Sequence, residues 1–292
     1  MALDYREAHH ARVFVAITFH YAKHRLRELF QVIKALSGFM TAGLDVIVAT
    51  NTSDENEIAS IQRLCGPLLE FASHSSDCQK SLEIHSFPNL TDPLLLPWAH
   101  KPLIVQRFLR EPDYTHYIYL EDDIQFSFAN LCYFLKYRQS LRRVGLLPSF
   151  VRVEYNFSDD ELYSSDQTGF IPIDNRAAVR RDGLLFMNIG NPYNAAFVLD
   201  RELAEEYAAT RSFRLETSET VHQWGPRERA ARGLCFENVP AGFNSRFVVP
   251  VSPFDLMVPA YAYLYHTANN YANDPGSGFG KILLRRLFAS RA

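Results

Sequence analysis

Three continuous apolar runs constrain the fold of this chain most strongly, because each has the pattern of a strand buried on both faces. They lie at residues 12–18, 45–50 and 116–120. Between the first two runs, apolar side chains recur at helical spacing over residues 26–36, and Gly38 follows as a helix stop. Strand, helix and strand in this order predict an α/β fold with a mostly parallel, Rossmann-like central sheet flanked by helices.

Shorter patterns predict further elements. The polar cluster after residue 50 can cap a helix over residues 57–64. The long polar segment at residues 156–175 is expected to be a loop, and the basic, amphipathic tail at residues 281–291 a terminal helix. Other strands are expected at residues 68–72, 82–85, 150–155 and 184–189, and other helices at residues 98–109, 131–141 and 203–209.

Composition excludes several classes of protein. The 292 residues suit one large domain or two small ones, and the net charge of -3 argues against a nucleic-acid binder. The four cysteines form no CxxC pair and suit neither a zinc site nor a disulfide framework, so we expect reduced thiols in a cytoplasmic protein. Residues 1–12 are polar and have the pattern of neither a signal peptide nor a membrane span.

Three consecutive acidic residues, Glu121, Asp122 and Asp123, follow the apolar run at residues 116–120. Carboxylates at the end of a buried strand repel each other and lose hydration, so a positive charge must compensate them. A divalent metal ion with hard oxygen ligands is the usual candidate, and open α/β sheets bind ligands at the carboxyl ends of their strands. We therefore expect this acidic triplet to hold a metal ion, and the metal ion to hold a diphosphate.

Nucleotide contacts are expected where the first two strands end, at Thr18, Phe19, His20 and Asn51. Lys101, on a predicted helix, is a candidate phosphate or base contact, although a solvated surface lysine has the same pattern. These polar side chains and the backbone around them would contact the base and ribose.

These motifs, in this order, resemble the GT-A fold of nucleotide-sugar glycosyltransferases. The shared features are a βαβ start, an acidic triplet of Asp-x-Asp type after a central strand, a glycine-containing loop, a Glu-bearing helix and a late histidine. The resemblance implies Asp123 as the principal ligand of manganese or magnesium, with Glu121 and Asp122 assisting. Glu stands where many members have Asp, which leaves open whether the first position touches ribose or metal.

Three later segments extend the resemblance. Glu228 begins a short helix and would be the general base of an inverting reaction, although a carboxylate at a helix N-terminus is also stabilised by the helix dipole. His266, which ends an aromatic-rich run, would be a further metal ligand, although such a histidine can equally be a core residue. The turn-rich loop that begins at Gly190 and Asn191 would lie beneath the donor sugar.

The activity that the resemblance implies is metal-dependent transfer of a sugar from a nucleoside-diphosphate sugar to a hydroxyl of a glycan or glycoconjugate. The expected donor is a UDP-sugar. The cofactor would be Mn²⁺ or Mg²⁺. The reaction would belong to polysaccharide biosynthesis. Residues 1–125 would form the nucleotide-sugar-binding half and residues 126–292 the acceptor-binding half of one continuous domain. Trp224 and Tyr193 suit stacking on acceptor sugar rings. The basic tail at residues 281–291 offers a peripheral membrane contact.

Three rival functions stay open. A nucleotidyltransferase would also use metal-binding carboxylates, but it usually carries a glycine-rich phosphate loop after the first strand, where this chain has no glycine. A glycoside hydrolase needs two facing carboxylates, and Glu121 and Glu228 would have to fill both roles. A sugar-binding module without activity would have the same fold with a degenerate site.

Overall fold

The computed structural model describes residues 3, 5–74, 78–174 and 176–289 of the chain. The chain divides into two compact units. The first, here termed the parallel-sheet unit, contains residues 4–128 and 195–234, and the second, the mixed-sheet unit, contains residues 1–3, 129–194 and 235–292. The unit that holds the acidic triplet therefore also takes a segment from the second half of the chain. Within the described residues, no helix is both long and apolar enough to cross a membrane.

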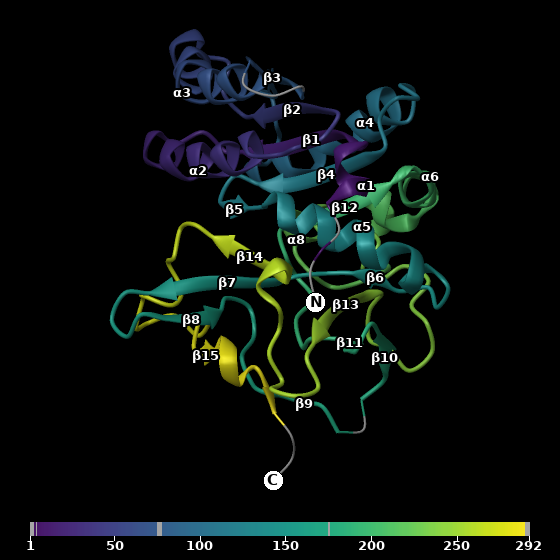
Figure 1. Ribbon diagram of the computed structural model, residues 1–292. Coiled ribbons are helices and arrows are strands. Elements are labelled where there is room, and N and C mark those ends of the chain that lie inside the picture. Colours follow the sequence, from purple (N-terminus) through teal and green to yellow (C-terminus); the bar gives the residue numbers. More distant parts are fainter. Residues whose placement is uncertain (1–2, 4, 75–77, 175, 290–292) are drawn as a thin grey trace. The chain divides into compact units, whose positions relative to one another are not determined.

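Five strands form the sheet of the parallel-sheet unit, in the order β12-β4-β1-β2-β3 (Figure 1). β1 (Arg12–Phe19), β2 (Gly43–Thr50), β3 (Gln79–Ser86) and β4 (His116–Glu121) run parallel, and β12 (Ala196–Asp200) runs antiparallel to β4. The central strand β1 is almost completely buried, as its continuous apolar pattern predicts. The predicted α/β fold with a mostly parallel sheet is confirmed for this unit.

Helices cover both faces of this sheet. α2 (Leu26–Ser37) and α3 (Glu55–His74) pack together on one face, and α4 (His100–Leu103) and α6 (Arg201–Ala209) lie on the other (Figure 1). The shorter elements of the unit are α1 (Arg6–His9), η1 (Lys23–Arg25), η2 (Pro93–Ala99), the π-helical turn η3 (Ile104–Phe108), β5 (Ile124–Gln125), η4 (Arg211–Phe213), α7 (Leu215–Ser218) and α8 (Pro226–Ala230).

The strand predicted at residues 68–72 is wrong, because these residues belong to α3. The helix continues through Pro67, and its buried side chains Ile61, Cys65 and Leu69 recur every fourth residue along one face. A short apolar run has no clear period of its own, so the packing of the longer helix decides its conformation.

Two small sheets organise the mixed-sheet unit, whose long helix is α5 (Phe128–Arg142). In one sheet β15 (Ile282–Leu283), β8 (Glu161–Ser164), β7 (Val151–Asn156) and β14 (Tyr263–His266) are adjacent in that order. The other sheet has the order β10 (Ala178–Arg181), β11 (Leu184–Met187), β13 (Phe247–Val251) and β6 (Leu147–Pro148). The remaining elements are β9 (Ile171–Pro172), which pairs with β16 (Phe288–Ala289), and the turns η5 (Ala260–Ala262) and η6 (Leu284–Arg286).

Two predictions for this unit are wrong for the same reason. The expected loop at residues 156–175 contains β8 and β9, and the expected terminal helix forms β15, η6 and β16 instead. Ile282 pairs with Ser164 and Phe288 with Ile171, so distant partners impose the strand conformation. Residue 175 and the end of the tail, from residue 290, lie outside the described residues. All four cysteines are buried and none forms a disulfide, as expected.

Gly280 supplies the first testable prediction. Its φ is +68°, and a Cβ there would lie 2.5 Å from the backbone N of Ala272, whereas a Cβ at Gly278 would meet nothing within 4 Å. We expect Gly280→Ala to lower the free energy of unfolding by at least about 1 kcal/mol, because the left-handed conformation and the clash add. Gly278→Ala is the matched control, and urea unfolding that gave both variants the same stability would contradict the prediction.

Candidate active site

The strand order of the parallel sheet creates a crevice at the carboxyl ends of β1 and β4. The chain proceeds from β1 to β2 and β3 on one side, then returns to place β4 on the other side of β1. The register pairs Thr18 with Glu121, so both strands end at the same edge. This reversal of strand order is the place where open α/β sheets bind ligands.

The acidic triplet lies at this point and is buried. Glu121 ends β4, and its backbone N donates to Ala195 O at 3.0 Å, while Asp122 and Asp123 form the turn that follows. The three residues are only 3%, 4% and 6% exposed, respectively. Their charges are therefore largely removed from water and need compensation within the protein.

Two arginines supply that compensation. Arg25, at the end of η1, places Nη2 at 2.8 Å from Asp122 Oδ1 and 2.9 Å from Asp123 Oδ2. Arg227, on α8, places Nη2 at 2.6 Å from Glu121 Oε2. Neither arginine lies in a motif that predicts a role for it, and the carboxylates with which they pair are 97 and 106 positions away for Arg25–Asp122 and Arg227–Glu121.

The burial of the triplet also changes its acid–base behaviour. Burial, and next the charge of Asp123, raise the pKa of Asp122 well above its ordinary value, against the opposing effect of Arg25. Asp122 Oδ2 is buried and makes no hydrogen bond. Beneath the triplet, the Thr18 and Tyr119 hydroxyls are 2.9 Å apart, and burial raises the pKa of Tyr119 well above the ordinary value.

A cavity of about 280 Å³ opens over this cluster. Polar groups from the ends of β1 and β4 face an apolar wall made by η2, a combination typical of small-molecule sites. The lining residues are Thr18, His20, Ala22, Arg25, Pro93, Leu94, Leu96, Pro97, Glu121, Asp122 and Arg227.

A hydrogen bond connects the apolar wall of the cavity, η2, to the helix α8 that carries Arg227. Trp98 Nε1 donates to Pro226 O at 2.9 Å, which joins η2 to the first residue of α8. Pro226 suits the first helical position because it lacks an N–H that would otherwise need a partner. This bond fixes the segment from which Arg227 reaches Glu121.

Glu228 and Trp224 lie beside this segment but do not line the cavity. Glu228 is half-buried, and its Oε2 lies so close to Gly225 that a Cβ there would be 2.5 Å away. The Trp224 ring packs edge-on against His222, with ring centroids 4.8 Å apart. Both belong to the same compact unit as the triplet.

The nucleotide candidates differ in their surroundings. Thr18 and His20 line the cavity. Phe19 is fully buried and packs against Tyr21, and Asn51 Oδ1 accepts a hydrogen bond from Tyr21 N at 2.7 Å. Asn51 thereby joins the segments that follow β1 and β2.

Lys101 lies at a second cavity, of about 510 Å³, in the same unit. Its Nζ donates to Ser212 O at 2.6 Å and lies 3.7 Å from the centre of the Trp98 ring. Lys101 is 3% exposed, so it is not the solvated surface lysine that its sequence also allowed. The second cavity is lined by Trp98, Lys101, Pro102, Val105, Gln106, Ala208, Phe213 and Arg214.

The buried ammonium gives a pH prediction. Burial, together with Arg232 and Arg229, lowers the pKa of Lys101 well below its ordinary value of 10.5. Between the lowered pKa and 10.5 the unfolded chain binds more protons here than the folded chain, so the free energy of unfolding rises with pH, by up to about 1.4 kcal/mol per unit. We expect Lys101→Met to lose this part of the slope. Urea unfolding across that pH range would refute the prediction if both proteins showed the same slope.

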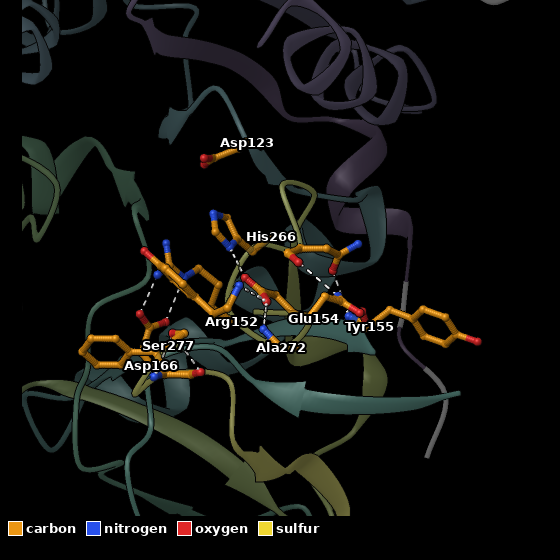
Figure 2. Close-up of polar contacts among 12 residues, drawn as sticks. Asp123, Arg152, Glu154, Tyr155, Asp166, His266, Ala272 and Ser277 are labelled. Atoms are coloured by element: carbon orange, nitrogen blue, oxygen red, sulfur yellow. Dashed lines mark hydrogen bonds and ion pairs between the residues drawn. The ribbon is translucent and has the colours of Figure 1, made fainter. Parts of the chain in front are cut away.

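The mixed-sheet unit holds His266 in a buried dyad (Figure 2). His266 Nδ1 is 2.5 Å from Glu154 Oε1, and Glu154 Oε2 accepts hydrogen bonds from the backbone N of Tyr271 at 2.9 Å and of Ala272 at 2.6 Å. A carboxylate that accepts the Nδ1 proton leaves the lone pair of a neutral imidazole on Nε2. Glu154 was missed in the sequence because the partners lie 112 positions apart.

Gly190, Asn191 and Tyr193 also belong to the mixed-sheet unit. Gln167 fixes the loop through two bonds: its Oε1 accepts from Asn191 N at 3.0 Å, and its Nε2 donates to Asn191 O at 2.7 Å. The Arg152 guanidinium lies 5.3 Å from the centre of the Tyr193 ring. Side chains from outside the loop, Gln167 and Arg152, therefore contact it at Asn191 and Tyr193.

The carboxylates of the acidic triplet have the oxygen chemistry that Mg²⁺ and Mn²⁺ prefer. Asp122 and Asp123 each direct an oxygen to the same Arg25 nitrogen, so two carboxylates converge on one positive charge. In the described part of the chain, no cluster of three or more His, Cys, Asp or Glu side chains is arranged to hold a metal ion. Mg²⁺ is often held by one or two carboxylates together with substrate phosphates, and such a site needs no larger cluster.

Comparisons with known proteins add little. No protein-family model matches the chain, and no curated protein matches it. One similar solved structure is the mannosyltransferase PcManGT from Pyrobaculum calidifontis, in complex with GDP-Man and Mn²⁺, at 15% identity and a TM-score of 0.31. The match covers 52% of this chain and 38% of that one. A likeness this weak carries no argument about function.

Proposed function

We propose that this protein is a metal-dependent glycosyltransferase that moves a sugar from a nucleoside-diphosphate sugar to a hydroxyl of a glycan or glycoconjugate. The proposed donor is a UDP-sugar. One observation carries the proposal: Glu121 and Asp122 of the buried acidic triplet line, together with two arginines, a cavity where the strand order of the sheet reverses. Asp123 does not line the cavity but pairs with Arg25, which does. Carboxylates suit Mg²⁺ or Mn²⁺, guanidinium groups suit phosphate, and the proline-rich wall suits a base or sugar face.

Each proposed role follows from the chemistry of the residue. Asp123 and Glu121 hold the cation, and Asp122 assists with its buried oxygen. The bound cation would stabilise the charge that develops on the leaving diphosphate. His20 and the backbone near Thr18 contact the nucleotide from the end of β1.

The remaining site residues are assigned proposed contacts from the chemistry of their side chains. Asn51 and Phe19 support the nucleotide segment, and Lys101 stays a proposed phosphate contact. His266 is a proposed ligand of the metal ion through Nε2, since Glu154 accepts a hydrogen bond from Nδ1 of the same ring. Gly190 and Asn191 are proposed donor contacts, and Trp224 and Tyr193 proposed acceptor contacts.

The proposed transfer is a displacement at the anomeric carbon of the donor sugar. The acceptor oxygen forms a bond to the anomeric carbon while the bond from that carbon to the β-phosphate oxygen breaks, and the electron pair leaves with the diphosphate. Glu228 takes the hydroxyl proton as general base. Attack opposite the leaving group inverts the anomeric centre, which NMR of the product would establish.

Asp123→Ala tests the cation site. We expect it to abolish transfer and to abolish stabilisation by nucleotide in the presence of Mn²⁺, because it removes the principal carboxylate. Thermal shift with UDP-, GDP- and CMP-sugars, with and without Mn²⁺, provides the measurement and also identifies the donor. Asp113→Ala, which removes an exposed aspartate of the same unit, is the control. Unchanged Mn²⁺-dependent stabilisation of Asp123→Ala would remove the proposed cation site.

Glu228→Gln tests the base. We expect transfer to slow by at least ~100-fold while donor binding stays intact, because the amide keeps the shape of the carboxylate but cannot accept the proton. Glu205→Gln, an exposed change on α6, should transfer at the normal rate. A near-normal rate for Glu228→Gln, measured under single-turnover conditions, would assign the base to another residue.

A further inference from the structure

We propose that Arg25 and Arg227 exchange partners during ligand binding: they form ion pairs with the acidic triplet in the ligand-free protein and turn to the diphosphate when a divalent cation binds the carboxylates. The inference rests on the proposed function and assigns two residues that no motif suggested. It predicts that cation and nucleotide strengthen each other's binding.

Arg25 occupies the position that a cation would need. Its Nη2 lies 2.8 Å and 2.9 Å from oxygens of Asp122 and Asp123. Mg²⁺ binds carboxylate oxygens at about 2.0–2.1 Å. A metal ion bound to these same two oxygens would lie within about 5 Å of the Arg25 nitrogen, and two positive charges at that separation repel each other strongly in a buried site. Cation binding therefore favours departure of the guanidinium.

The arginines are the groups that can move. The carboxylate side chains of Glu121, Asp122 and Asp123 are 4–8% exposed, whereas those of Arg25 and Arg227 are 28% and 43% exposed. Both arginines line the cavity, so a displaced guanidinium stays beside the bound ligand. A guanidinium can bind a phosphate through two parallel hydrogen bonds.

The exchange of ion-pair partners is most favourable when both ligands are present. Three carboxylates face two guanidinium groups, so the arginines offset most of the negative charge of the buried cluster without ligand. A divalent cation alone would displace Arg25 from Asp122 and Asp123. Arg25 would lose both ion pairs without gaining a new one, and this loss opposes binding of the cation. A diphosphate supplies that partner, so each ligand raises the affinity of the other.

The test measures the two affinities separately in the 292-residue chain. Mn²⁺ binding without nucleotide is followed by electron paramagnetic resonance, and UDP binding at saturating Mn²⁺ by calorimetry. For Arg25→Met we expect Mn²⁺ alone to bind at least ~5-fold tighter, because the competing cation is gone, and UDP to bind at least ~10-fold more weakly, because a phosphate partner is gone. For Arg227→Met we expect the same signs. Arg27→Met, which changes a 75% exposed arginine on α2, should match wild type in both.

The opposite signs separate the exchange from simple damage. If Arg25→Met weakens the binding of both Mn²⁺ and UDP, or changes neither affinity, the proposed exchange of partners is overturned while the proposed function stands. If wild type binds neither Mn²⁺ nor UDP, the proposed function falls first. Should Arg25→Met fail to fold, Arg25→Lys keeps the charge and loses the planar fork; we expect near-normal Mn²⁺ binding and weaker UDP binding, and unaltered UDP affinity would overturn the inference.

Discussion

The pairing of the buried acidic triplet with two arginines is the interaction on which the candidate site depends. Glu121, Asp122 and Asp123 are buried at the carboxyl end of β4, an interior strand between β12 and β1. Three neighbouring carboxylates cannot remain there without positive charge. Arg25 and Arg227 provide it, and in doing so they bring η1 and α8 to the carboxyl edge of the sheet.

The apolar wall of the cavity has a second structural function. η2 lines the cavity with prolines and leucines, and its Trp98 anchors α8 through Pro226 O. The same indole ring covers the buried ammonium of Lys101. One short 3₁₀ element therefore positions an arginine of the first cavity and a lysine of the second, which explains how short, irregular segments can be held firmly around a regular sheet.

The mixed-sheet unit follows the same physical rule with a different pair of groups. Glu154 has no exposed surface, and its two oxygens accept hydrogen bonds from His266 and from two backbone amides. Because every partner is fixed, the imidazole has one orientation and one preferred tautomer. A carboxylate partner at Nδ1 favours the tautomer whose lone pair lies on Nε2.

The sequence alone determined the strands β1, β2 and β4, the helix α2 and the position of the acidic triplet, because hydrophobic periodicity and chain order are local properties. It failed at residues 68–72 and in the C-terminal tail, where short patterns are ambiguous and distant neighbours decide the conformation. Only the tertiary structure showed what compensates the triplet and what holds His266, since those contacts join residues 97 to 112 positions apart. A charge pattern shows that a partner is needed, but the fold decides which residue is close enough to be that partner.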